Sequence, residues 1–186
     1  MTFVQRLDTF PRKSIVIGAV LFALISFLLL VFLFQSVEAA VAPTGYGILD
    51  LEFAWTASQA TIILAAWGPL FIPLEIQGVY LDFAFIPSYV TLVAGLILLL
   101  TRRFTGCAKT LGFGCVLATP IAGLLDVVEN LNLLTMMSAP TTIAESIPFT
   151  ASLCATIKFA LLIATISYFL LGLLMAALSK LLPRKP

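Results

Sequence analysis

The sequence has no histidine at any of its 186 positions. Histidine is the commonest general base and the commonest transition-metal ligand, so its absence excludes every Ser-His and Cys-His catalytic pair. Cysteine is scarce as well: the spacings of Cys107, Cys115 and Cys154 fit no zinc or redox motif, and three cysteines make no disulfide framework. We interpret them as small apolar packing residues, and we expect neither a metal ion nor a cofactor.

Charge is the second thing this sequence has little of. Only 10% of the residues are charged, whereas 61% are hydrophobic. A soluble domain has nearer one-half apolar and one-quarter charged residues, so we predict an integral membrane protein with membrane lipid as its surroundings. The length suits about four or five membrane spans with short loops. The net charge of +1, without a basic patch beyond the loop ends, argues against nucleic acid as a partner.

Long apolar runs predict four membrane-spanning helices, at about residues 14–35, 80–101, 111–136 and 151–178. The first run is longer than the apolar part of a secretory signal, so we expect it to be a retained anchor. A further helix is expected at about 51–68, ended by Gly68-Pro69 and Pro73. The predicted fold is therefore all-α: residues 1–186 form a single membrane domain, a bundle of four spans plus one external, re-entrant or fifth membrane helix.

The basic residues indicate how the chain is oriented. Nine of the ten Lys and Arg residues lie at the N-terminus, in the 102–109 loop or in the C-terminal tail. Cytoplasmic loops carry such an excess, and an even number of crossings with both termini in the cytoplasm places all nine on that side. Segment 51–73 is then external or re-entrant and buried against protein, with a true fifth crossing as the alternative. We expect the inner (cytoplasmic) membrane of a bacterium.

Three polar residues interrupt the third predicted span. Asp126, Glu129 and Asn130 stand in GLLDVVENLNLL at positions i, i+3 and i+4, a spacing that puts them on one face of a helix. Thr119 and Ala122 continue this face with small side chains, which let a neighbouring helix approach closely. Ionisable residues inside a span are costly and mark functional positions, so we interpret this face as the wall of a buried polar site.

Lys158 is the only basic residue predicted inside a span. It lies about eight residues from the outer end of its helix and Asp126 about ten from its own, so the two are expected at similar depth. The sequence therefore predicts an ion pair of Lys158 with Asp126 or Glu129. One negative charge is left over, so either a carboxyl carries a proton or a further partner completes the site. A buried pair that only sets the helix register is the competing interpretation.

Two further polar groups are candidates for the same site. Asp82 opens the second predicted span, and Tyr89 lies two turns further along the same face. Glu52, Thr56 and Gln59 form a polar stripe on the predicted helix before that span, as expected of a helix packed on a polar cavity. Taken alone, Asp82 has a second interpretation as a helix N-terminal carboxylate favoured by the dipole. Glu52 alone would also be compatible with a surface facing water.

Four motifs carry a resemblance to a family of small bacterial multi-pass membrane proteins. The family pattern runs FE-x-A, a tryptophan, LD-x-x-F, AG-x-x-D-x-x-EN-x-x-LL and KF. The matching stretches are LEFAW at 51–55, LDFAF at 81–85, AGLLDVVENLNLL at 122–134 and KF at 158–159. Leu51 stands where the family has an aromatic residue. The resemblance implies that the polar positions belong together, and it implies no particular activity.

The site is compatible with several functions. We favour a pocket for a small or amphiphilic ligand, in which Asp126 and Glu129 orient a hydroxyl or amine and Lys158 neutralises them. A structural or assembly subunit of a membrane complex, or a homo-oligomer, is the alternative. A lipid-modifying enzyme using a carboxyl as general acid stays open, although no nucleophile motif supports it and no catalytic residue is assigned. An ion-coupled carrier is the last candidate, because the chain is short and has no inverted repeat.

Overall fold

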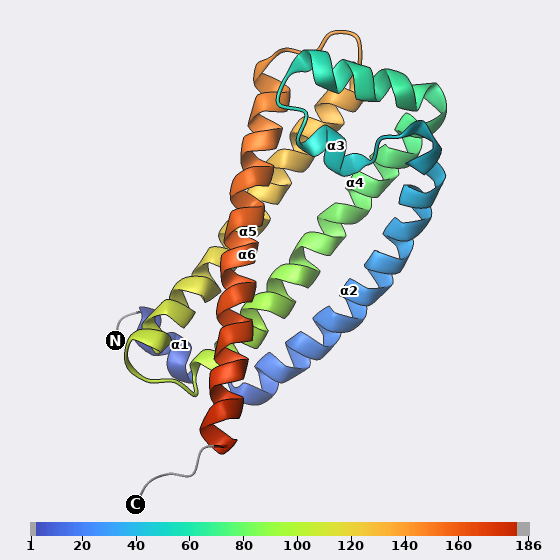
Figure 1. The fold of residues 1–186 in the computed structure, drawn as a ribbon. Coiled ribbons are helices and arrows are strands. Elements are labelled where there is room, and N and C mark those ends of the chain that lie inside the picture. Colours follow the sequence, from blue (N-terminus) through green and yellow to red (C-terminus); the bar gives the residue numbers. More distant parts are fainter. Residues whose placement is uncertain (1–2, 182–186) are drawn as a thin grey trace, which may run out of the picture.

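The computed structural model describes residues 3–181, and within that range it contains helices and no strand. Figure 1 shows the order of the elements along the chain. They are α1 (Phe3–Thr9), α2 (Lys13–Val41), the short 3-10 helix η1 (Ala42–Thr44), α3 (Ile48–Glu52), α4 (Ala57–Thr101), α5 (Gly106–Ser138) and α6 (Ser146–Leu181). The predicted all-α fold is confirmed.

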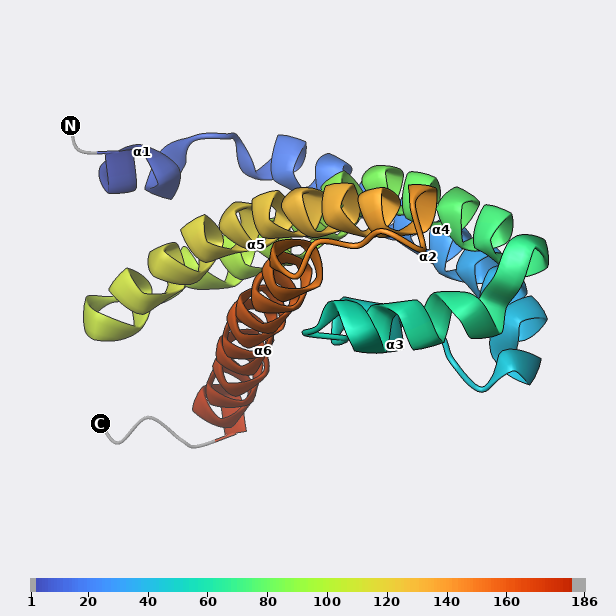
Figure 2. The ribbon, with the colours of Figure 1, turned by 90° about the horizontal axis from the view of Figure 1, so that it is seen from above.

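Four of these helices, α2, α4, α5 and α6, are long and apolar enough to cross a membrane. A helix satisfies its backbone hydrogen bonds internally, which is what an apolar run needs in lipid. The last part of α4 packs between α2 and α5, and α6 packs mainly on α5. Viewed from above, α6 leans away from α2 (Figure 2).

The second long helix begins earlier than the prediction placed it. Its long part starts directly after Gly68 rather than at residue 80, and it continues to residue 101 through Pro73 and Pro87. The prediction that Pro73 ends a helix is therefore wrong. A proline removes one backbone hydrogen bond, but membrane helices tolerate this where neighbouring helices or a local adjustment satisfy the freed carbonyl. The first span is also longer than predicted, since α2 extends to Val41.

The segment expected as one helix at 51–68 is divided in two. Helix α3 ends at Glu52, residues 53–56 are irregular, and α4 begins at Ala57 with Thr56 Oγ1 accepting a hydrogen bond from the Gln59 backbone N–H at 3.2 Å. The first part of α4, residues 57–67, lies across the end of the bundle (Figure 1). At about 1.5 Å per residue it spans roughly 16 Å, well short of the ~30 Å hydrocarbon core.

Two apolar clusters flank the middle of the bundle. The upper cluster joins α3, the first part of α4 and the end of α5, where Trp67 is buried and donates its indole N–H to the Tyr46 carbonyl at 3.0 Å. The lower cluster joins α2, α4 and α5 around Ile97 and Phe113. Between them Gly123 of α5 lies so close to α4 that a Cβ there would overlap Val90. The expected close approach of a neighbouring helix to the small residues of α5 is therefore confirmed, and that neighbour is α4. The polar residues of α5 lie between the two apolar clusters.

Gly68 provides the turn between the two parts of α4, and it adopts φ 58° and ψ −172°. This backbone region is accessible essentially only to glycine. We expect Gly68→Ala to lower the free energy of unfolding by about 1–3 kcal/mol, measured by thermal or denaturant unfolding in detergent. Gly114→Ala is the control, because Gly114 is helical and has open space around it, so the variant should be neutral or slightly more stable. Equal effects of the two substitutions would contradict a special role for Gly68.

Candidate functional site

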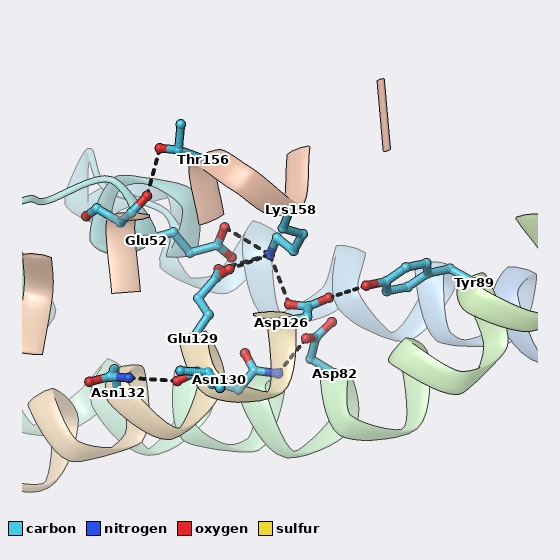
Figure 3. Close-up of polar contacts among 11 residues, drawn as sticks. Glu52, Asp82, Tyr89, Asp126, Glu129, Asn130, Asn132, Thr156 and Lys158 are labelled. Atoms are coloured by element: carbon cyan, nitrogen blue, oxygen red, sulfur yellow. Dashed lines mark hydrogen bonds and ion pairs between the residues drawn. The ribbon is translucent and has the colours of Figure 1, made fainter. Parts of the chain in front are cut away.

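Lys158 on α6 is surrounded by carboxylates from two other helices (Figure 3). Its ammonium nitrogen lies 2.9 Å from Asp126 Oδ1 and 2.9 and 2.8 Å from the two oxygens of Glu129, both on α5. Glu52, at the end of α3, is further away, with its Oε2 at 3.7 Å. The predicted ion pair is therefore confirmed, and Lys158 contacts both candidate partners at once. We call these four residues the lysine–carboxylate cluster.

Hydrogen bonds connect the cluster to α4. The Tyr89 hydroxyl donates to Asp126 Oδ2 at 2.9 Å, so Asp126 is held by a neutral donor and a charged one. One turn further along α5, the Asn130 amide donates to Asp82 Oδ2 at 2.6 Å. Both contacts join α4 to α5, and Figure 3 shows them beside Lys158. Six of the polar residues that the sequence singled out therefore meet at one level of the bundle: Asp82, Tyr89, Asp126, Glu129, Asn130 and Lys158.

The cluster is deeply buried. Glu129 is 0% exposed and Lys158 is 5% exposed. Twelve positions separate Asp126 from Ser138 at the end of α5, and twelve separate Lys158 from Ser146 at the start of α6, which corresponds to roughly 18 Å in each case. An isolated ionised side chain near the middle of a bilayer costs at least ~2.5–3.5 kcal/mol, so these groups need one another.

Contacts between α6 and the chain that follows α3 hold Glu52 at this depth. Ala151 and Ala155 of α6 are fully buried, and Ala151 belongs to the same apolar cluster as Ala54 of the irregular chain. In that chain Trp55 has a positive φ of 60°, and its backbone N–H donates to the Ser152 hydroxyl at 2.9 Å. This bond fixes the turn to α6, because Trp55 comes three residues after Glu52 and Ser152 lies just under two helical turns before Lys158. Ser152 was not among the predicted residues, because its partner is a backbone group far away in sequence.

The charges of the site do not balance. Four carboxylates, those of Glu52, Asp82, Asp126 and Glu129, face one ammonium group. Burial raises the pKa of the Glu52 carboxyl above its ordinary value, and Lys158 compensates only in part. The Glu52 oxygen nearest to Lys158 has no hydrogen bond among the described residues. The predicted excess of negative charge is therefore present, and it is larger than Asp126 and Glu129 alone would give.

Three interpretations of individual polar residues are wrong. Asp82 lies within a continuous helix, well after Gly68, so its interpretation as a helix N-terminal carboxylate is wrong. Glu52, Thr56 and Gln59 do not form a stripe, because the chain leaves the helix between Glu52 and Ala57, and Gln59 is exposed. Glu52 is buried in the site rather than facing water.

Glu75 on α4 is a buried carboxylate that the sequence analysis did not select. It is 2% exposed and lies two turns before Asp82 on the same helix. The seven-residue spacing between them was a usable signal, since residues at i and i+7 share a helix face. The spacing did not identify Glu75 because the sequence predicted that this helix begins at residue 80, which leaves Glu75 in a loop before it.

A groove of about 330 Å³ borders the cluster, and its lining residues run from Asp82 to Val93 on α4 and from Lys158 to Ile166 on α6. Its polar end is formed by Glu52, Asp82, Asp126 and Lys158. The rest of its wall is apolar and comes from three helices: Phe27 of α2, Leu92 and Val93 of α4, and Leu162 and Ile166 of α6. The groove therefore has one charged end and one hydrocarbon end.

The side chains present limit the chemistry of the site. In the part of the chain that the structure describes, no three Asp, Glu, Cys or His residues are grouped so that they could hold a metal ion. The arrangement can neutralise a charge, donate or accept hydrogen bonds and hold an apolar chain. Comparisons with protein-family models, curated proteins and solved structures find no match to this chain. The family resemblance stays a prediction, and the function has to be inferred from the site itself.

The cluster predicts a specific pattern of stability. Lys158→Met should lower the free energy of unfolding by about 3–5 kcal/mol, because it leaves buried carboxylates without their counter-charge. Adding Glu129→Gln should restore more of this loss than adding Asp126→Asn. Asp126 keeps its hydrogen bond from Tyr89, whereas the fully buried Glu129 side chain has no side-chain donor other than Lys158 among the described residues. Denaturant unfolding of the single and double variants in detergent measures both effects.

The matched control is Lys109→Met. Lys109 pairs with Asp8 at 2.8 Å, but both side chains are partly exposed, so the loss should be below about 1 kcal/mol. If neither carboxylate substitution improves the Lys158→Met protein, the cluster does not hold its charges by mutual compensation.

Proposed function

We propose that this chain is an integral membrane protein that binds an amphiphilic molecule, with its polar head at the lysine–carboxylate cluster and its apolar chain in the groove beside α6. The observation that carries the proposal is the groove itself, in which buried charge and hydrocarbon surface follow one another along a single cavity. A ligand site is usually a mainly apolar cavity with a few convergent polar groups, and its volume of about 330 Å³ suits one narrow chain.

The position of α6 supports binding from the lipid phase. The groove has walls from both α2 and α6, and α6 leans away from α2 (Figure 2). Phe27 of α2 and Ile166 of α6 line the groove. An amphiphile could therefore slide in sideways from the bilayer with its tail already in hydrocarbon, so that only its head has to exchange lipid or water contacts for protein contacts.

The unequal charges favour a binding site over a purely structural ion pair. A pair that only sets helix register would be most stable with matched charges and closed packing. Here one lysine serves three carboxylates directly, a fourth stands next to them, and the group borders a cavity. Such an arrangement keeps acceptor oxygens available, which a ligand hydroxyl or amine would use.

The distribution of charge supports an orientation with both termini in the cytoplasm. Arg6, Arg12 and Lys13 lie at the same end of the bundle as Arg102, Arg103 and Lys109 (Figure 1). The opposite end, which carries the loops at 42–56 and 139–145, has no basic residue. By the positive-inside rule this end faces outward, and the polar site then lies in the outer half of the bilayer. A bacterial inner membrane is the location we propose.

Blocking the groove tests the proposed function. Leu162→Trp places an indole in the groove wall, and Ile163→Trp places the same group on an exposed face of α6 outside it. We expect wild-type protein and the Ile163→Trp control, purified in a gentle detergent, to carry the same stoichiometric amphiphile by native mass spectrometry. The Leu162→Trp protein should lose it while remaining folded. Retention of the molecule in the blocked variant would contradict the proposal, as would a fixed protein partner in place of any lipid.

The orientation has its own test. Cys107 is exposed at the basic end, and Thr142 is exposed in the loop at the other end. In intact cells an impermeant thiol reagent should leave Cys107 unmodified, and it should label Thr142→Cys in a Cys107→Ser background. Both should react once the membrane is opened. Labelling of Cys107 from outside would reverse the proposed orientation without affecting the groove.

A further inference from the structure

A second cavity, of about 190 Å³, lies beneath α3 next to the groove. Its walls come from the end of α2, from α3, from α4 and from Asn130 of α5. It borders on Glu52, Asp82 and Phe85, which also line the groove. The two cavities are therefore neighbours that share one partition of side chains. We call the second one the acidic cavity, because of the charges described next.

The acidic cavity is lined by four carboxylates, those of Glu38, Glu52, Glu75 and Asp82, and by no lysine or arginine among the described residues. Lys158 lines the groove and not this cavity. Asp82 has a donor in Asn130, and Glu52 has the distant ammonium of Lys158. The electrostatic potential inside such a space is strongly negative, because low-dielectric walls concentrate the field of like charges.

Glu75 is the carboxylate of this cavity that points to a bound ligand. It is 98% buried, and its Oε1 has no hydrogen-bond partner within the described chain. It also projects from a helix that is long and apolar enough to cross a membrane. An ionised carboxylate with no partner in such surroundings is very costly, so Glu75 either carries a proton or takes a partner from outside the chain. A cation that enters the cavity would be such a partner.

The walls decide which class of cation suits the space. No three carboxylates are grouped so that they could hold a metal ion, as far as residues 3–181 show. The remaining wall is apolar and aromatic: Phe34 and Phe85 meet edge to face with ring centroids 5.4 Å apart. Aromatic faces attract organic ammonium groups, and carboxylates accept their N–H bonds. A phosphate would find no unpaired cation in these walls.

We propose that the acidic cavity binds the ammonium head of a cationic, phosphate-free amphiphile, next to the lysine–carboxylate cluster, with which the cavity shares Glu52, while the apolar chain of the amphiphile lies in the groove. Glu75 accepts a hydrogen bond from the head, the other carboxylates balance its charge, and Phe34 and Phe85 contact its carbon atoms. This inference rests on the proposed function, since it assigns a chemical class to the ligand of the same groove. A cationic head would also neutralise the excess negative charge of the site, which Lys158 alone does not balance.

The test compares two ligands that differ only in the head. The full chain is placed in nanodiscs of neutral phosphatidylcholine, and binding of dodecylamine and of dodecanol is measured by titration calorimetry against empty nanodiscs. We expect wild-type protein to prefer the amine. Glu75→Gln should weaken dodecylamine binding by about tenfold or more and leave dodecanol binding unchanged, because one charge-assisted hydrogen bond is lost.

A stability measurement separates binding from folding. Without ligand, Glu75→Gln should unfold at the same temperature as wild type or higher, because the substitution removes a buried carboxylate with no partner. Asp8→Asn is the matched control, since it removes a carboxylate near the opposite end of the bundle and should change neither ligand's affinity. Should the Glu75 variant not fold, Glu38→Gln at the exposed rim of the cavity provides the same comparison with a smaller loss, of about two- to fivefold.

The outcomes distinguish this inference from the proposed function. Equal affinities for amine and alcohol, unaffected by the Glu75 or Glu38 substitution, would overturn the ammonium site and leave the groove intact. Displacement of dodecylamine by calcium at a similar concentration would also overturn it, in favour of an inorganic cation. Binding of neither probe, together with no loss of co-purified lipid in the Leu162→Trp variant, would contradict both proposals.

Discussion

The contact between the Lys158 ammonium and the carboxylates of Glu129 and Asp126 is the interaction on which the arrangement of this bundle depends. It lies about twelve residues from the nearest ends of α5 and α6, where the side chains are buried and an unpaired charge is costly. Each long helix near it is therefore constrained: α5 and α6 must present these residues at one level, and α4 must bring Tyr89 to Asp126. Apolar packing above and below then closes the bundle around the charged layer.

The same layer borders both the groove and the acidic cavity. Its carboxylates outnumber the ammonium group, and side chains from α2 and α6 line the groove beside it. The glycine turn at Gly68 and the bond from Trp55 to Ser152 hold α3 and the first part of α4 across the end of the bundle opposite α1, which places Glu52 at the site. One carboxylate oxygen of Glu75 and one of Glu52 have no hydrogen-bond partner among the described residues, which lowers the stability of the fold.

Much of the site could be predicted from periodicity and charge. The i, i+3, i+4 spacing of Asp126, Glu129 and Asn130 requires a shared face in any helix, and a lone intramembrane lysine needs a carboxylate partner. The errors came from proline and from a short turn. Pro73 suggested a helix end, which hid Glu75 and made Asp82 look terminal, because local sequence does not show that neighbouring helices compensate for one lost hydrogen bond.

The sequence by itself determined the helical class, the apolar runs, the polar face of α5 and the need for Lys158 to find a carboxylate, since these follow from backbone hydrogen bonding and the cost of charge in hydrocarbon. Only the tertiary structure decided that Glu52 joins the cluster while Gln59 stays outside, and that Glu75 lines a cavity without a partner. Those outcomes depend on the direction in which the chain leaves α3 and on the tilt of α6. Both are set by contacts between residues far apart in sequence, which no local pattern contains.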